Sequence, residues 1–201
     1  PLYVKEIERE DGFKGFAVSG TPADCVKNGM KSLLSFIPDL ILSGINIGSN
    51  LGNNIIYSGT VAAAIEGATL DIPSIAISID SYKPGSFSTS KIVVRKVINF
   101  MENNTIPSGT ILNVNIPDCE PSDLKGYKIT SQGHQYFNDN FEKRADPSGR
   151  NYYWMTGEII DNDKELRYDG FAVSNGYASI TPIHFMMTNT NCLDELERSI
   201  I

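Results

Sequence analysis

The sequence predicts an α/β fold in which a mostly parallel sheet is covered by helices on both faces. Two observations lead to this prediction: short apolar segments typical of buried strands alternate with longer segments whose apolar residues recur at helical spacing. With 201 residues, of which 41% are hydrophobic and 20% charged, the chain can bury the core that such a fold needs.

The alternation occupies the first part of the chain. A helix is expected to begin at Thr21, which suits the N-cap, because Pro22 suits the first helical position and Asp24 favours the positive end of the helix dipole. Three apolar segments are expected as buried strands, with a helix in each interval between them. The strands are expected at 40–42, 74–79 and 110–116, and the helices at 61–70 and 90–101.

The character of the sequence changes after Pro117. A strand is expected at 127–131, and the aromatic, charged segment 134–158 contains the turn sequence Asp-Pro-Ser-Gly at its middle, which predicts a long β-hairpin arm. A last strand (177–183) and a short amphipathic helix (191–201) follow. We therefore expect two regions. Residues 1–125 form the α/β core, and residues 126–201 carry the arm, the last strand and the C-terminal helix.

The arm has more large rings than one small core can cover. Tyr and Trp are enriched where subunits meet, which favours contact with another subunit, while a flap over the same chain remains the alternative.

Charge and cysteine content exclude several classes of protein. The net charge of -7 and the pI of about 4.8 argue against a surface that binds nucleic acid, although a bound cation could still admit a small phosphorylated substrate. No apolar run approaches the roughly 18 residues of a membrane span. The three cysteines are widely spaced and form no C-x-x-C pair, which favours reduced thiols in a cytoplasmic protein.

The most informative segment is Ser-Gly-Ile-Asn-Ile-Gly-Ser-Asn-Leu-Gly at 43–52, which follows an apolar strand and precedes a helix start at Ser58-Gly59-Thr60. Ligands of open α/β sheets bind at the carboxyl ends of strands. Glycines allow close backbone approach, and a helix start offers free N–H groups, so the segment predicts a site for an anion, alone or with a metal. The dinucleotide and P-loop motifs are absent.

This site lacks charge. Neutral Asn and Ser oxygens alone hold Mg²⁺ or Mn²⁺ weakly, and the nearest carboxylate in sequence, Asp24, already has a role at a helix start. The only histidines are His134 in the arm and His184 after a strand, and for both a structural role is favoured over acid–base catalysis.

The runs PDLILSGINIGSNLG at 38–52 and IYSGTVAAAIEG at 56–67 closely resemble the SurE family, the stationary-phase survival proteins, which are metal-dependent 5′/3′-nucleotidases. Shorter matches follow the same order along nearly the whole chain. They lie at 20–26, 73–78, 112–117, 152–155 and 176–182.

The resemblance implies a Rossmann-like three-layer core, with the arm and the C-terminal helix exchanged in homodimers or tetramers. It also implies hydrolysis of nucleoside monophosphates with one Mg²⁺ or Mn²⁺ per subunit. Asn46 matches a metal ligand of the family, Ser58, Gly59 and Thr60 match its phosphate-side motif, and Asn50 lines the same pocket.

Two departures from the family pattern stand out. The family's Asp-Asp pair and a Ser ligand are expected upstream of Pro1, in a first β-α-β unit of roughly 40–50 residues. Asn53 and Asn54 stand where many relatives carry acidic residues. Two alternatives to the nucleotidase stay open: a non-catalytic nucleotide-binding or scaffold homologue without the acidic ligands, and a Rossmann oxidoreductase, which would need a G-x-G-x-x-G loop.

Overall fold

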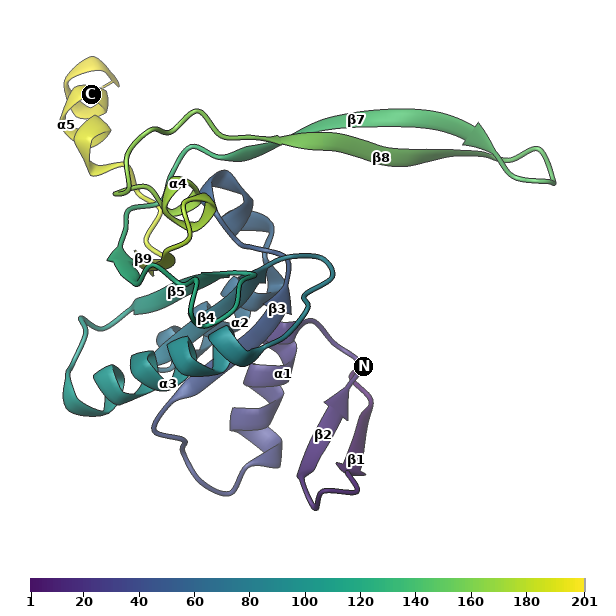
Figure 1. The fold of residues 1–201 in the computed structure, drawn as a ribbon, viewed down its shortest axis with the longest axis vertical. Helices are drawn as coiled ribbons and strands as arrows, with labels where there is room; N and C mark the ends of the chain where they lie inside the picture. Colours follow the sequence, from purple (N-terminus) through teal and green to yellow (C-terminus); the bar gives the residue numbers. More distant parts are fainter. Residues whose placement is uncertain (201) are drawn as a thin grey trace.

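The body of the protein is built on a five-stranded sheet, and the computed structural model describes residues 1–200 (Figure 1). In spatial order the strands are β3 (Ile41–Ile47), β4 (Ser74–Asp80), β5 (Thr110–Pro117), β9 (Ala178–His184) and β6 (Tyr127–Ile129). β3, β4 and β5 run parallel, β9 runs antiparallel to β5, and β6 runs parallel to β9. The mostly parallel sheet is therefore confirmed.

Helices cover both faces of this sheet. The helices of the body are α1 (Pro22–Asn28), α2 (Gly59–Thr69), α3 (Ser88–Asn103) and α4 (Asp169–Ser174), and a last helix, α5 (Leu193–Ile200), lies outside it. Successive residues of a strand point to opposite faces, and β4 shows the result: Ile75 and Ile77 pack in the cluster of α3, whereas Ala76 packs in the cluster of α2. Since both faces need apolar cover, β4 is apolar or buried nearly throughout. The predicted three-layer core is confirmed.

Strand β3, which corresponds to the strand expected at 40–42, is longer than predicted. The sequence predicts a strand only at 40–42 and a loop from Ser43, but β3 continues to Ile47, so the first half of the glycine segment is strand. The register shifts between Ser43 and Asn46, and Gly44 has a positive φ of 110°. A Cβ at Gly44 would lie 2.2 Å from the carbonyl oxygen of Ile77. The glycine therefore lets β3 bulge and still pair with β4.

Several elements have no counterpart in the prediction. They are the hairpin of β1 (Val4–Glu8) and β2 (Lys14–Val18), the 3-10 helix η2 (Gly52–Tyr57), and α4. The π-helical turn η1 (Gly29–Leu33) instead continues the helix expected from Thr21, and the 3-10 helix η3 (Thr190–Cys192) lies at the start of the helix expected at 191–201. The hairpin has a sequence signal that the prediction did not use, the Asp11-Gly12 pair between the two strands. The short helices lie where polar and glycine residues hide any helical period.

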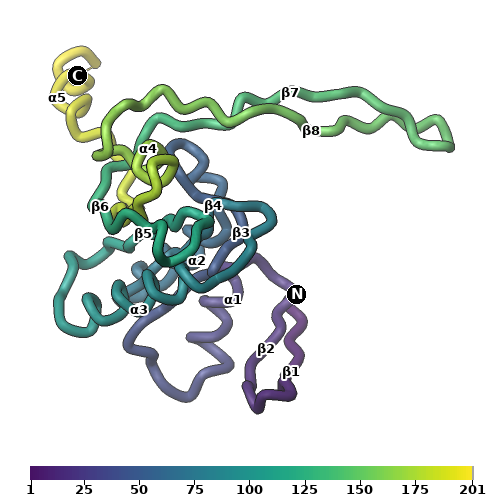
Figure 2. The backbone as a smooth tube through the Cα atoms, in the orientation of Figure 1, coloured from purple at the N-terminus to yellow at the C-terminus, as the bar shows by residue number. Residues whose placement is uncertain are grey.

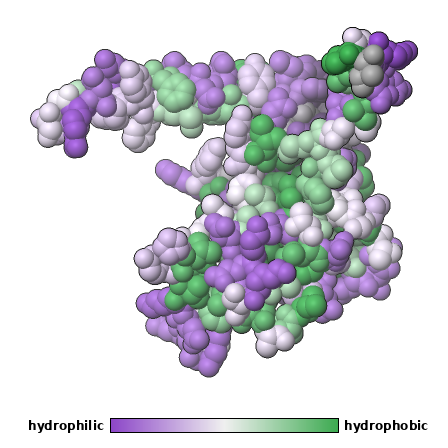
Figure 3. Space-filling model, turned by 180° about the vertical axis from the view of Figure 1, so that it is seen from behind, coloured by the Kyte–Doolittle hydropathy of each residue, from purple (hydrophilic) through white to green (hydrophobic). Residues whose placement is uncertain are grey.

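The arm consists of β7 (Tyr136–Ala145) and β8 (Asn151–Ile160), which pair along their full length and extend away from the body (Figures 1 and 2). The predicted turn closes through Gly149 N–H, which donates to the carbonyl of Asp146 at 2.9 Å. Seen from behind, the outer arm stands clear of the body (Figure 3). The hairpin arm is thus confirmed, and its base meets η2 of the same chain.

The C-terminal helix α5 also projects from the body, at the yellow end of the tube in Figure 2. Its apolar residues Leu193, Leu196 and Ile200 are exposed. No helix among residues 1–200 combines the length and the apolar character needed to cross a bilayer.

Candidate functional site

Asn46 lies near the carboxyl end of β3, opposite Ser78 of β4. Its Nδ2 donates to the carbonyl of Gly48 at 2.7 Å and to that of Ile47 at 3.3 Å. Gly48 N–H in turn donates to the carbonyl of Ile79 at 3.0 Å, which ties the segment to β4. These contacts orient the amide of Asn46 and leave its Oδ1 as an acceptor with no partner among the described residues.

Asn50 holds the glycine segment to the sheet. Its backbone N–H donates to Asn115 Oδ1 and its Nδ2 to Ser78 Oγ, both at 2.7 Å. Its carbonyl accepts from Nδ2 of Asn113 at 2.9 Å and of Asn115 at 3.0 Å. All four residues are buried. Asn50 thus fixes the path of the chain beyond Asn46 through a network that reaches β4 and β5, a role that the sequence did not suggest.

The phosphate-side motif forms the start of α2. Ser58 is the N-cap: its Oγ accepts from the backbone N–H of Val61 at 3.2 Å, and its hydroxyl proton stays free to donate. The backbone N–H groups of Gly59 and Thr60 donate to no carbonyl or side chain in the described part of the chain. The positive end of the helix dipole is therefore open to an anion at this point. The helix begins two residues before the predicted start because the cap is Ser58.

The first turn of α1 lies against this helix start. A Cβ at Gly59 would lie 3.0 Å from the ring of Pro22, so the glycine permits close approach of the two helices. The Asp24 carboxylate accepts from Thr21 N–H at 2.9 Å and from Thr21 Oγ1 at 2.7 Å, which completes a capping box. Hydrogen bonds from Thr21 lower the pKa of Asp24. The structural role predicted for Asp24 is confirmed.

A buried carboxylate that the sequence reading missed fastens the end of the glycine segment. Asp169, at the start of α4, is fully buried; its Oδ2 accepts from Gly52 N–H at 3.1 Å, and its Oδ1 accepts from Gly133 N–H at 2.9 Å and Gly170 N–H at 2.8 Å. Burial raises the pKa of Asp169, against the opposing effect of these three N–H donors. An isolated Asp-Gly pair reads as a turn in sequence, so no pattern indicated this role.

The same segment rests on the base of the arm. Asn53 N–H donates to the carbonyl of Gln135 at 2.7 Å, and Gln132 Nε2 donates to the carbonyl of Gly52 at 3.0 Å. Gly52 has a φ of 53°, and a Cβ there would lie 2.4 Å from the Gln135 carbonyl oxygen. The glycines at 44 and 52 therefore give room for the protein's own backbone, whereas the sequence suggested room for a ligand.

The two histidines have different surroundings. His134 at the base of the arm meets Asp163: its Nδ1 lies 2.9 Å from Oδ1, and its backbone N–H donates to Oδ2 at 2.8 Å. Burial acts to raise the pKa of Asp163, but the two hydrogen bonds from His134 outweigh it, so the pKa is lowered. His184 ends β9 and lines a cavity of about 610 Å³ together with Ser58 and Met186.

The residues at the carboxyl edge fit a divalent metal only in part. The free amide oxygen of Asn46 is a hard ligand suited to Mg²⁺ or Mn²⁺. Within residues 1–200 no group of three or more His, Cys, Asp or Glu side chains is placed to hold a metal ion. Asn46 therefore suits the role of one neutral ligand in a site whose charged ligands are not among these residues.

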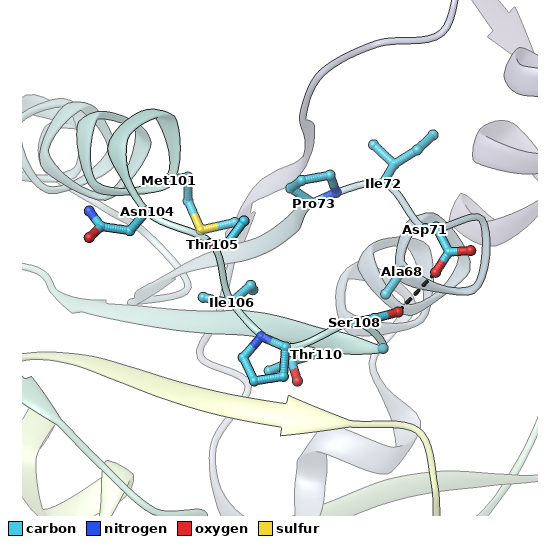
Figure 4. Close-up of a pocket in the computed structure, with 12 residues that line it drawn as sticks. Ala68, Asp71, Ile72, Pro73, Met101, Asn104, Thr105, Ile106, Ser108 and Thr110 are labelled. Atoms are coloured by element: carbon cyan, nitrogen blue, oxygen red, sulfur yellow. Dashed lines mark hydrogen bonds between the residues drawn. The ribbon is translucent and has the colours of Figure 1, made fainter.

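A second cavity lies at the opposite, amino-terminal edge of the sheet (Figure 4). Its volume is about 280 Å³, and it lies between the ends of α2 and α3 and the segment leading into β5. Ser108 Oγ donates to Asp71 Oδ1 at 2.9 Å in this cavity. At this edge the Ser108 hydroxyl and the Asp71 carboxylate bond each other, whereas at the edge that holds Asn46 its Oδ1 has no partner among the described residues.

Comparisons with known proteins agree on one family. The family described as Survival protein SurE matches residues 1–139. A protein of Thermosipho melanesiensis named 5'-nucleotidase SurE is 45% identical over 98% of this chain and 77% of its own length, and one of the same name from Pelotomaculum thermopropionicum is 45% identical over 98% and 76%. The crystal structure of the Aquifex aeolicus SurE protein superimposes with a TM-score of 0.79 at 40% identity, covering 98% of this chain and 79% of that one.

Proposed function

The chain belongs to the survival protein SurE family, and from this premise we propose that it carries the phosphate side of the active site of a metal-dependent 5′-nucleotidase. The observation that carries the proposal is the free Oδ1 of Asn46 at the same edge of the sheet as the open N-terminus of α2. An oxygen ligand for a cation beside N–H donors for an anion is the arrangement that a phosphomonoester bound to a metal requires.

The proposed substrate is a nucleoside monophosphate. Ser58 Oγ–H and the N–H groups of Gly59 and Thr60 would bind the phosphate oxygens, and the dipole of α2 would favour their charge. Asn50 would keep these groups in register with Asn46 through its bonds to the sheet. In the overall reaction water replaces the nucleoside oxygen on phosphorus, and the products are the nucleoside and inorganic phosphate.

Asn46 would supply one neutral ligand to a single Mg²⁺ or Mn²⁺. The bound cation would neutralise phosphate charge and lower the pKa of a water molecule. We place the remaining ligands, an acidic pair and a serine, on residues upstream of Pro1; this chain spans 77% of the length of two relatives named 5'-nucleotidase SurE. The catalytic base belongs to the same proposal and is not assigned to a residue of this chain.

We further propose that the protein acts as a homodimer, or a tetramer of two such dimers, joined through the arm and α5. The outer arm exposes Tyr153, Trp154 and Met155, and α5 exposes its apolar residues to no partner within the described chain. Large aromatic side chains at such density suit a subunit contact. A cytoplasmic location is proposed on the three cysteines, all of which are free thiols.

The test measures hydrolysis of AMP by the full-length protein, with Mg²⁺ or Mn²⁺ and with EDTA. Asn46→Ala should lower turnover at limiting metal by about tenfold or more, because one ligand and its orienting contacts are lost. Asn104→Ala is the matched control, since Asn104 lines the cavity at the opposite edge. Unchanged turnover of Asn46→Ala would contradict its role. Absence of metal-dependent hydrolysis in the wild type would contradict the nucleotidase and favour the non-catalytic homologue.

A further inference from the structure

A cavity lies between η2 and the base of the arm, close in sequence to the proposed phosphate site. Its volume is about 830 Å³, within the range of small-molecule sites. Tyr57 comes from the end of η2, and Tyr136 and Phe137 come from the first two residues of β7. Figure 1 shows the arm leaving the body beside the segment that joins β3 to α2, and β7 contacts η2 there.

The lining combines rings with amides. Tyr57 is 83% exposed and Tyr136 41%, so both residues are open to a ligand. The side chains of Asn53 and Asn54 form no hydrogen bond within residues 1–200, and Gln132 uses only its Nε2, for Gly52. Rings that stack on a flat group, beside amides that can pair with its edge, are what proteins use to bind a nucleobase.

The negative charge in the cavity argues against binding of the phosphate group there. Among the residues that line it, Asp139 alone is charged, and its charge is negative. This carboxylate would repel a phosphate. A neutral heterocycle could instead donate hydrogen bonds from its N–H groups to the carboxylate and to the amide oxygens.

One residue that lines the cavity is next in sequence to the proposed phosphate site. Tyr57, which lines it, is the residue directly before Ser58, the N-cap of α2. A substrate with its phosphate at Ser58 can therefore direct its other end along η2 towards the rings. A nucleoside monophosphate has this shape, with the base a ribose away from the phosphate.

From these observations we infer that the cavity between η2 and the base of the arm binds the nucleobase of the substrate, with Tyr57 as a stacking residue. The inference rests on the proposed function and deepens it, because it makes the base of the arm part of the substrate site. It predicts that the enzyme distinguishes a nucleotide from the same sugar phosphate without a base.

The experiment compares kcat/KM for AMP with kcat/KM for ribose 5-phosphate in the full-length protein. The wild type should prefer AMP, and Tyr57→Ala should reduce this preference by about 5- to 100-fold, the effect expected for loss of one stacked base. Tyr57→Phe, which keeps the ring, should retain the preference. Tyr3→Ala, which removes an exposed ring outside the cavity and outside the proposed subunit contact, should leave the preference as in the wild type.

Each outcome decides one of the two proposals. Equal kcat/KM for both substrates in the wild type, or an unchanged preference in Tyr57→Ala, would overturn the base site while the nucleotidase stands. An equal loss of preference in Tyr3→Ala would also overturn it, since the effect of Tyr57→Ala would then not depend on the cavity. Calorimetric binding of adenosine, weakened in Tyr57→Ala, with no hydrolysis of either substrate, would instead remove the nucleotidase and keep the site.

Discussion

The two ends of helix α2 lie at opposite edges of the same sheet, and they differ in what they leave unsatisfied. At its start, the N–H groups of Gly59 and Thr60 are free and Asn46 offers an unpaired oxygen. At its end, Leu70 and Asp71 donate back to carbonyls of the helix, and Asp71 accepts from Ser108. Both edges have a cavity, so a cavity alone does not identify the site. Unsatisfied donors and acceptors do.

The largest effect on stability is expected at Asp169, which holds the end of the glycine segment at the edge of the candidate site. Asp169→Ala would leave three buried N–H groups without an acceptor, and at about 1 kcal/mol or more each the free energy of unfolding should fall by about 3 kcal/mol. Denaturant unfolding of the full-length protein measures this loss. A loss below about 1 kcal/mol would show that water replaces the Asp169 carboxylate as acceptor and that these three bonds do not hold the segment in place.

The variant Asp169→Asn tests the bond to Gly52 separately from the bonds to Gly133 and Gly170. If its oxygen keeps Gly133 and Gly170, its amino group faces the N–H of Gly52, so this one contact becomes repulsive. We expect a smaller loss of stability than in Asp169→Ala, together with reduced turnover. Full turnover at reduced stability would mean that the position of Gly52 does not matter for the site.

Ser58 comes next, because it serves both the helix and the proposed phosphate. Ser58→Ala should cost about 1 kcal/mol of stability, whereas Ser58→Gly should cost only a few tenths, since glycine is a tolerated N-cap. Both variants lack the hydroxyl and should raise KM for AMP by about tenfold, the value of one hydrogen bond to a charged group. Thermal unfolding and kinetics distinguish the two roles, and a normal KM in Ser58→Gly would limit Ser58 to capping.

A smaller, pH-dependent effect is expected at the base of the arm. The pKa of Asp163 is lowered in the folded protein by its bonds from His134. The unfolded protein therefore binds more protons as pH falls through the ordinary Asp pKa of about 3.9, and the stabilisation is lost below it. The difference in unfolding free energy between wild type and Asp163→Asn should be about 1 kcal/mol near pH 7 and should vanish in acid. Chemical denaturation at several pH values measures it, and a difference that grows in acid would refute this sign.

The smallest effect is expected at the amino-terminal edge. Ser108→Ala removes the bond to Asp71, both residues being exposed, and should change stability by less than about 0.5 kcal/mol. Hydrolysis of AMP should not change. A marked loss of turnover would remove the distinction between the two edges.

Much of the fold was predictable because local signals and burial agree. The caps at Thr21 and Ser58, the apolar runs of β4 and β5 and the Asp-Pro-Ser-Gly turn of the arm are local features with known structural preferences. The continuation of β3 to Ile47 was not predictable, since it depends on the fit of Gly44 against a neighbouring strand.

The sequence predicted which residues belong to the candidate site better than it predicted the hydrogen bonds that hold them in place. Asn46 and Ser58 stand out in sequence because they flank a strand end and a helix start. Asp169 does not, because its partners lie 36 and 117 residues away and only the fold brings them together. The structural role of Asn50 is hidden for the same reason, since its partner Asn115 lies 65 residues along the chain.

The strand order has a consequence for how the protein is made. β9 pairs with β5 on one side and β6 on the other, so the central sheet is incomplete until residue 184 has been synthesised. The arm precedes β9 in the chain and therefore leaves the ribosome before the body that supports it can close. Until β9 is made, the nascent chain presents both the rings of the arm and the unpaired edge of β5, and in this interval aggregation or premature pairing with a neighbouring chain is most favoured.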